Sequence, residues 1–119
     1  MEQREATKSD IVDLLGQWEN QQVRVYIFSH GVGVNYWGYL ELAYDTNKWN
    51  QYGPSPTKPV PSIVSLCRTK KTGAVHTGIP IVVINLDVFK SFQILEANSS
   101  QSAVLENEEA QIRVLIERG

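Results

Sequence analysis

The sequence has little that is typical of secreted or membrane proteins. It contains one cysteine, Cys67, so it cannot form an internal disulfide, and its 119 residues are enough to fold without one. The longest apolar run, residues 79–84, is far too short to cross a bilayer. The N-terminal stretch MEQREATKSD has no apolar core and therefore predicts no signal peptide. We expect a cytoplasmic protein that does not associate with membranes.

Basic residues are not in excess either. Eleven lysines and arginines face thirteen aspartates and glutamates, which gives a formal net charge of −2. Proteins that grip phosphates non-specifically are usually basic, so the overall charge does not favour nucleic-acid binding. A local cluster at a predicted hairpin tip, Arg68, Lys70 and Lys71, is the one candidate phosphate contact.

Residues suited to metal binding or catalysis are few and scattered. His30 and His76 each stand in a predicted turn, with no second ligand at a suitable spacing. Cys67 lies within a predicted strand and has no base beside it to activate the thiol. The acidic run at 106–109 lacks the glycine-containing loop of a calcium site. We therefore expect no metal, no cofactor and no enzymatic activity.

The stretch SHGVGVNYWGYLELAYD, residues 29–45, has glycines spaced like the start of a phosphate-binding loop. A dinucleotide-binding fingerprint needs a third glycine where Tyr36 stands, followed by a helix, but the alternation after it predicts a strand. Gly73 and Gly78 have P-loop spacing, but Ile79 follows where a lysine is needed. We expect the glycines near residue 31 to supply positive φ angles in a hairpin turn.

Apolar periodicity divides the chain into one helix and several strands. A stripe at helical spacing predicts a helix over about 7–18, with Ser9 and Asp10 at its start. Alternation predicts strands over 23–28, 37–45, 62–68 and 91–96, and the β-branched run 79–86 is typical of a strand buried on both faces. A proline-rich loop fills 46–61, and 86–90 suits one helical turn. Residues 106–110 favour a helix, whereas the alternation that follows favours a strand over 111–117.

Together these elements predict a mainly β protein with an N-terminal helix. The expected architecture is one small antiparallel barrel of five or six strands over residues 1–119, with strands from about 22 to 117 and the helix covering one open end.

Aromatic side chains gather on one face of the predicted hairpin. Tyr26 and Phe28 fall on the same side of its first strand, and Trp37 and Tyr39 join them if Phe28 lies opposite Trp37. The other face, with Val23 and alternating aliphatic residues, supplies a core. The aromatic face then needs a cover, which the N-terminal helix, another subunit or a ligand would provide.

The order of parts resembles the Sm-like small barrels, the family that includes the Lsm and Hfq proteins, and SH3-type barrels share much of it. The likeness lies in the helix, the strand 23–27, Gly38-Tyr39-Leu40, an acidic Asp45 and the stretch VVINLDVFKSFQI. The family implies ring oligomers that bind RNA. The RNA-contacting positions differ, because Asn50 lies one residue too far from Asp45 and Asn85-Leu86 stands where the family has Arg-Gly.

Two functions are compatible with these features. The leading interpretation is a non-catalytic binding module that associates with a protein partner or with itself, as a homo-oligomer, through Tyr26, Phe28, Trp37 and Tyr39. The alternative is an Sm-like module that binds single-stranded nucleic acid, with Arg68, Lys70 and Lys71 on the phosphates and the aromatic side chains stacked on bases.

Overall fold

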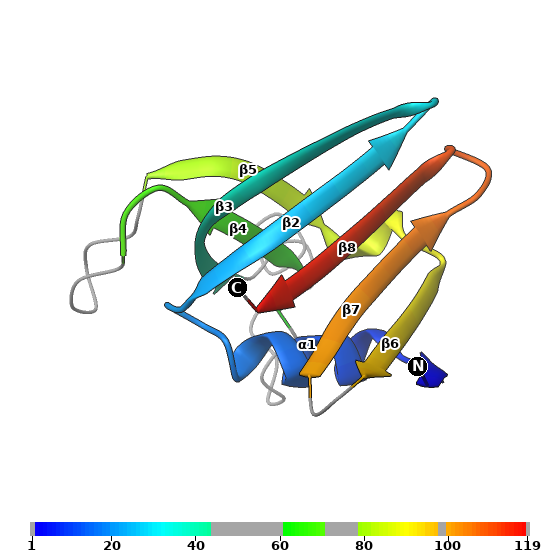
Figure 1. Ribbon diagram of the computed structural model, residues 1–119, viewed down its shortest axis with the longest axis horizontal. Coiled ribbons are helices and arrows are strands. Elements are labelled where there is room, and N and C mark those ends of the chain that lie inside the picture. The colour runs from blue at the N-terminus through cyan, green and yellow to red at the C-terminus, as the bar shows by residue number, and fades with distance from the viewer. Residues whose placement is uncertain (1, 44–60, 71–78, 98–99, 119) are drawn as a thin grey trace, which may run out of the picture.

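A computed structural model describes residues 2–43, 61–70, 79–97 and 100–118, which form one antiparallel sheet curved round a single helix (Figure 1). The elements in chain order are β1 (Glu2–Ala6), α1 (Lys8–Gly16), β2 (Gln22–Ser29), β3 (Val32–Ala43), β4 (Ile63–Cys67), β5 (Pro80–Asn85), the 3-10 turn η1 (Leu86–Val88), β6 (Ser91–Ala97), β7 (Ser100–Asn107) and β8 (Ile112–Arg118). The protein is therefore mainly β with one short helix, as the sequence predicts.

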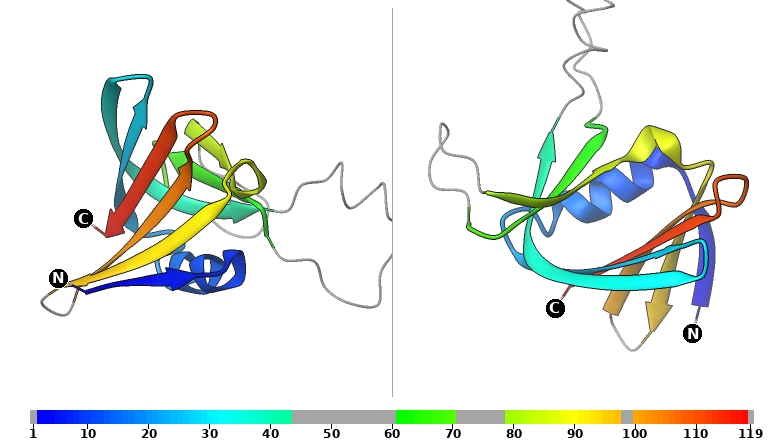
Figure 2. Two further views of the ribbon diagram at one scale, coloured as in Figure 1. Left: turned by 90° about the vertical axis from the view of Figure 1, so that its right-hand side faces the viewer. Right: turned by 90° about the horizontal axis from the view of Figure 1, so that it is seen from above.

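The sheet has eight strands rather than five or six, in the order β1-β6-β7-β8-β2-β3-β4-β5. Its two edge strands, β1 and β5, do not pair with each other, so the described strands do not close into a barrel. Seen from above in Figure 2, the sheet instead curves round α1, which lies on its concave side.

The core fills the space between α1 and the concave face of the sheet. Ile11, Leu14 and Leu15 of the helix belong to one buried cluster with Val23 and Val25 of β2 and with the inward side chains of the other strands. Trp18, just after the helix, is buried in the same core. The stripe that predicts the helix is therefore also the surface by which the helix attaches to the sheet.

Helix α1 begins at Lys8, one residue before Ser9 and within the predicted range. Thr7 is the N-cap: its Oγ1 accepts a hydrogen bond from the Asp10 backbone N–H at 3.2 Å, while the Asp10 carboxylate accepts one from the Thr7 N–H at 2.9 Å. This reciprocal pair is a capping box. Asp10 therefore has the expected role at the helix start, whereas the capping hydroxyl is that of Thr7.

Two strands, β1 and β7, are not predicted by the sequence patterns. β1 is the polar segment EQREA, which is held to β6 through its backbone at the sheet edge and shows no apolar alternation. β7 contains three consecutive buried residues, Ala103, Val104 and Leu105, so its burial does not alternate. The helix suggested at 106–110 does not form, because β7 runs to Asn107 and a turn leads into β8, which confirms the C-terminal strand.

The β2–β3 turn shows that the glycine-containing stretch near residue 31 forms a hairpin. It consists of His30 and Gly31, with φ angles of 52° and 81°, the combination of positive φ values that tight hairpins prefer. Gly31 thus has the expected role, while Gly33 lies within β3. Because the turn is so short, β3 starts at Val32 rather than near Trp37.

One prediction about burial is wrong. β5 is an edge strand, and two of its β-branched side chains, Ile81 and Val83, are exposed. The predicted turn after it is present as η1, and in the next strand Phe92 packs on the same core as Ile94. Several residues used in the sequence predictions lie outside the described residues. They are the proline-rich loop up to residue 60, Asp45, Asn50, Lys71, Gly73, His76 and Gly78.

Candidate functional site: an aromatic row on the convex face

The four predicted aromatic residues share the convex face of the sheet. In the β2–β3 pairing, Trp37 lies opposite Arg24, and Phe28 lies opposite Gly33. The expected pairing sets Phe28 opposite Trp37, so the observed register is shifted from the expected one by an even number of residues. Because side chains alternate with a period of two, this difference keeps all four on the same face. We call Tyr26, Phe28, Trp37 and Tyr39 the aromatic row.

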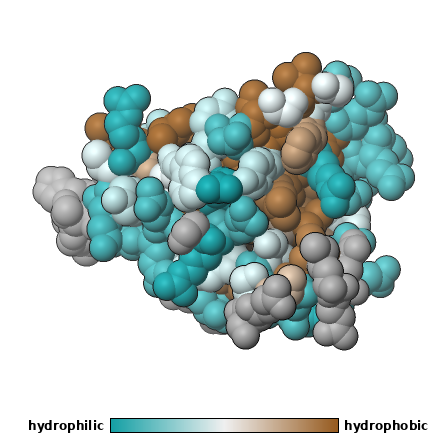
Figure 3. Space-filling model, viewed as in Figure 1, coloured by the Kyte–Doolittle hydropathy of each residue, from teal (hydrophilic) through white to brown (hydrophobic). Residues whose placement is uncertain are grey.

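The helix does not cover this row. α1 belongs to the same buried cluster as Val23, Val25 and Leu40, whose side chains alternate with those of the row and point to the concave side. Phe28 and Trp37 accordingly keep 48% and 43% of their surface exposed. On the face shown in Figure 3, apolar surface extends from the β2–β3 tip down over β8 and β7. The first of the three possible covers is thereby excluded.

Arg24 organises the middle of the row, a role that the sequence patterns do not reveal. Its guanidinium carbon lies 3.7 Å from the centroid of the Trp37 ring, and its Nη1 lies 2.6 Å from the Tyr26 hydroxyl. Across β8, Glu117 lies 3.8 Å away and balances its charge. The stack and the hydrogen bond hold Arg24, Trp37 and Tyr26 in one arrangement. Only the pairing register, which sets Arg24 opposite Trp37, brings these groups together.

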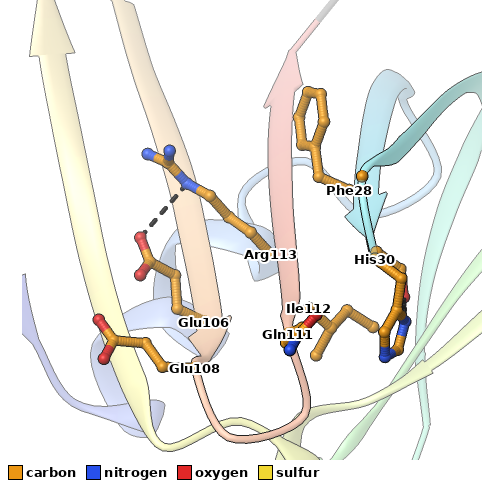
Figure 4. A pocket seen from close by; sticks show the side chains of 9 residues that line it. Phe28, His30, Glu106, Glu108, Gln111, Ile112 and Arg113 are labelled. Carbon is orange, nitrogen blue, oxygen red and sulfur yellow. Dashed lines mark hydrogen bonds and ion pairs between the residues drawn. The ribbon is translucent and has the colours of Figure 1, made fainter.

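A pocket of about 260 Å³ continues the row at the hairpin tip. It lies between the β2–β3 and β7–β8 turns, and its lining includes Phe28, His30, Ile112, Arg113 and Glu106 (Figure 4). Arg113 and Glu106 form an ion pair of 3.3 Å across β8 and β7. Phe28 thus belongs both to the aromatic row and to this tip pocket, so the two form one surface.

Chemistry in the tip pocket is limited. Ser29 Oγ and His30 Nδ1 lie 2.9 Å apart, a contact that sequence reasoning missed because the two residues are adjacent in a turn. In the described part of the chain, no hydrogen bond or ion pair joins His30 to a carboxylate that would orient it as a base. The described residues also contain no group of three or more metal-ligating side chains.

The predicted phosphate contacts lie at the other end of the row. Cys67 pairs with Tyr39, so Arg68 begins the basic segment next to the Tyr39 end of the row. Arg68 and Lys70 are exposed, whereas Lys71 lies outside the described residues. The acidic side chains of residues 106–109 form ion pairs with different partners: Glu106 pairs with Arg113, and Glu109 pairs with Lys90.

Cys67 is a buried thiol with only 1% of its surface exposed. Its Sγ donates a hydrogen bond to Glu41 Oε2 at 2.9 Å. Burial, with a smaller contribution from Glu41, raises the pKa of the Cys67 thiol to about 12. The thiolate, which is the reactive form, is therefore scarce at neutral pH.

We expect a disulfide reagent such as dithionitrobenzoate to modify Cys67 at pH 8 only as fast as the protein unfolds. The thiol titrates near 9 when unfolded, so its burial stabilises the fold fully below pH 9, and this contribution falls as the pH rises toward 12. Reaction of the native protein at the rate of an exposed thiol would contradict this placement. Labelling in 6 M guanidinium provides the reference rate.

None of the helices in the described part of the chain is long and apolar enough to span a membrane. Comparison of the chain with known proteins gives no match to a protein-family model, a curated protein or a solved structure. The resemblance to Sm-like and SH3-type barrels therefore stays a prediction.

Proposed function

We propose that the protein is a non-catalytic binding module and that its aromatic row docks on another protein. The observation that carries this proposal is the cluster of exposed Trp37 with half-buried Arg24 and Tyr26, on a sheet face that the helix leaves open. Tryptophan, tyrosine and arginine are the residues most enriched among those that dominate binding energy at protein interfaces.

The geometry of the cluster favours tight docking. Arg24 is already held by the Trp37 ring and the Tyr26 hydroxyl, so less side-chain freedom is lost when a partner covers it. The tip pocket beside Phe28 offers a shallow, largely apolar depression for an apolar side chain of the partner. Its Arg113–Glu106 pair at the rim would favour partners with polar groups at the matching position.

Charge balance argues against the nucleic-acid alternative. Arg24 and Arg113, the two arginines on the convex face near the row, each have a carboxylate within 4 Å, namely Glu117 and Glu106. A surface that binds phosphates needs cations that are not neutralised in this way. One observation favours the alternative, which is the position of Arg68 at the Tyr39 end of the row.

Site-specific photo-crosslinking in the cells that make the protein tests the proposal. With p-benzoylphenylalanine in place of Trp37, we expect a covalent adduct that protease removes and nuclease does not. The same probe at Val88, which is exposed but lies in η1 away from the row, is the matched control and should not give this adduct. Arg24→Ala in the Trp37-probe protein should weaken the adduct.

Three results would contradict the proposal. They are the absence of any adduct at position 37, the same adducts at positions 37 and 88, and an adduct that nuclease removes. The last result would instead support the module for single-stranded nucleic acid. In that case purified protein would bind short RNA more tightly than the roughly 10⁻⁴–10⁻⁶ M of non-specific phosphate binding, and Trp37→Ala would remove the gain.

A further inference from the structure

The two edges of the sheet are built differently. β1, at one edge, carries charged side chains at Arg4 and Glu5. β5, at the other edge, has the sequence PIVVIN, and no residue from 79 to 86 is ionisable. Natural proteins protect sheet edges with charges because an unprotected edge pairs with other strands. β1 is protected in this way, whereas β5 is not.

Backbone hydrogen bonds show which groups β5 presents at its outer edge. The Leu86 N–H donates to the Ser62 carbonyl, and on the far side of a bulge the Arg68 N–H donates to the Ile79 carbonyl. In an antiparallel ladder, residues that bond to one neighbour alternate with residues whose N–H and C=O point the other way. Ile84 lies two residues before Leu86, so its backbone N–H and C=O point toward β4. The backbone N–H and C=O of Val83 and Asn85 point outward.

The side chains on this edge are also unusually apolar for a surface. Val83 is 60% exposed and Ile81 41% exposed, and Ile79 just before the strand is exposed as well. Among the described strands, β4 alone pairs with β5. The outer edge thus combines outward N–H and C=O groups with exposed β-branched side chains, which is the surface that an added β-strand requires.

We propose that two copies of this chain pair through their β5 strands, antiparallel and across a two-fold axis. With the axis at Ile84, Val83 of each copy lies opposite Asn85 of the other. The two outward N–H groups and two outward C=O groups of each copy then form four hydrogen bonds, which leaves none of them unpaired.

A second copy suits this edge for two reasons. β5 has no charged side chains, so it can lie beside its own copy without repulsion between like charges. Two copies of the charged strand β1 would place like charges opposite each other in some registers. An isologous pairing of β5 with β5 also closes after two copies, whereas pairing of β5 with β1 of another copy would continue into a filament. Pairing of two short strands buries less than a standard interface of about 1,200–2,000 Å², so we expect a dissociation constant in the micromolar range.

This inference is independent of the proposed function, because β5 and the aromatic row are separate surfaces. Sedimentation velocity of the purified protein from about 1 to 200 μM should show a monomer–dimer equilibrium. Val83→Lys should raise the dissociation constant at least about tenfold, since it places two ammonium groups near the axis without touching the core. Val88→Lys, at an exposed apolar residue outside the strand, is the matched control and should leave the equilibrium unchanged.

Amide hydrogen exchange adds a readout at the level of single bonds. The Val83 and Asn85 amides should become protected as the protein concentration rises, while the Ile84 amide, which faces β4, should be protected at every concentration. A strict monomer with fast exchange at Val83 would overturn the proposal. So would a dimer that survives Val83→Lys but dissociates in Trp37→Glu, because the self-interface would then lie on the aromatic row.

Discussion

Leu15→Ala is expected to lower the free energy of unfolding by about 2–5 kcal/mol, the range measured when a buried leucine is cut back to alanine. Leu15 is fully buried, and it anchors α1 to the concave face of the sheet. Its removal leaves a cavity between the helix and the concave face of the sheet that the curved sheet cannot close without moving the helix. Urea unfolding followed by circular dichroism measures the loss.

Trp37→Ala is the matched comparison for Leu15→Ala. Trp37 is larger than leucine, yet its ring lies on the convex face and contacts Arg24 rather than the core. We expect its removal to change the free energy of unfolding by less than about 1 kcal/mol, as for most surface substitutions and exposed cation–π pairs. Equal losses for the two variants would show that both faces of the sheet are core, which would contradict the assignment of α1 to the concave face alone.

Gly38→Ala is expected to destabilise the protein by about 1–3 kcal/mol, the usual cost of inserting a methyl group where there is no space. A Cβ atom at Gly38 would lie 2.5 Å from the Cys67 carbonyl oxygen and 3.0 Å from Leu66 Cγ. The first of these is a backbone atom of β4, so β3 and β4 would have to separate. Glycine is therefore required at this position by the close approach of the two strands.

Gly16→Ala is the control for Gly38→Ala, because it makes the same glycine-to-alanine change at a position with free space. Gly16 ends α1, has open space where a Cβ would lie, and does not have a positive φ. Alanine there should raise the free energy of unfolding by up to about 1 kcal/mol through its higher helix propensity. If Gly38→Ala were equally harmless in urea unfolding, the close contact between β3 and β4 would be wrong.

The sequence predicts those elements whose burial alternates or repeats at helical spacing. The stripe of Ile11 and Leu15 predicts α1, and the alternation around Val23 predicts β2, because one face of each packs on the core. β1 and β7 escape this reasoning for opposite reasons. β1 is polar and is held by its backbone at an edge, while β7 is buried on both faces around Val104. Strand number, and with it the choice between a barrel and an open sheet, depends on these two elements.

The candidate site is predictable in part for the same physical reason. A period of two puts Tyr26, Phe28, Trp37 and Tyr39 on one face in any even register, so the aromatic row follows from the sequence. The partnership of Arg24 with Trp37 does not follow, because it depends on the two-residue turn at His30 and Gly31. Likewise, the apolar run of β5 suggests burial from composition alone, and only the strand order shows that it lies at an edge.

The solvent accessibility of Trp37 decides whether the aromatic row is an open binding surface. The direct measurement is acrylamide quenching of fluorescence in a variant that keeps Trp37 as its single tryptophan, with Trp18→Phe and Trp49→Phe. Trp37 is 43% exposed, so we predict red-shifted emission and strong quenching, whereas a variant that keeps only Trp18, which is 5% exposed, should be shielded. If Trp37 in the purified monomer were shielded as strongly as Trp18, the chain itself would cover the row, and binding through it would be contradicted.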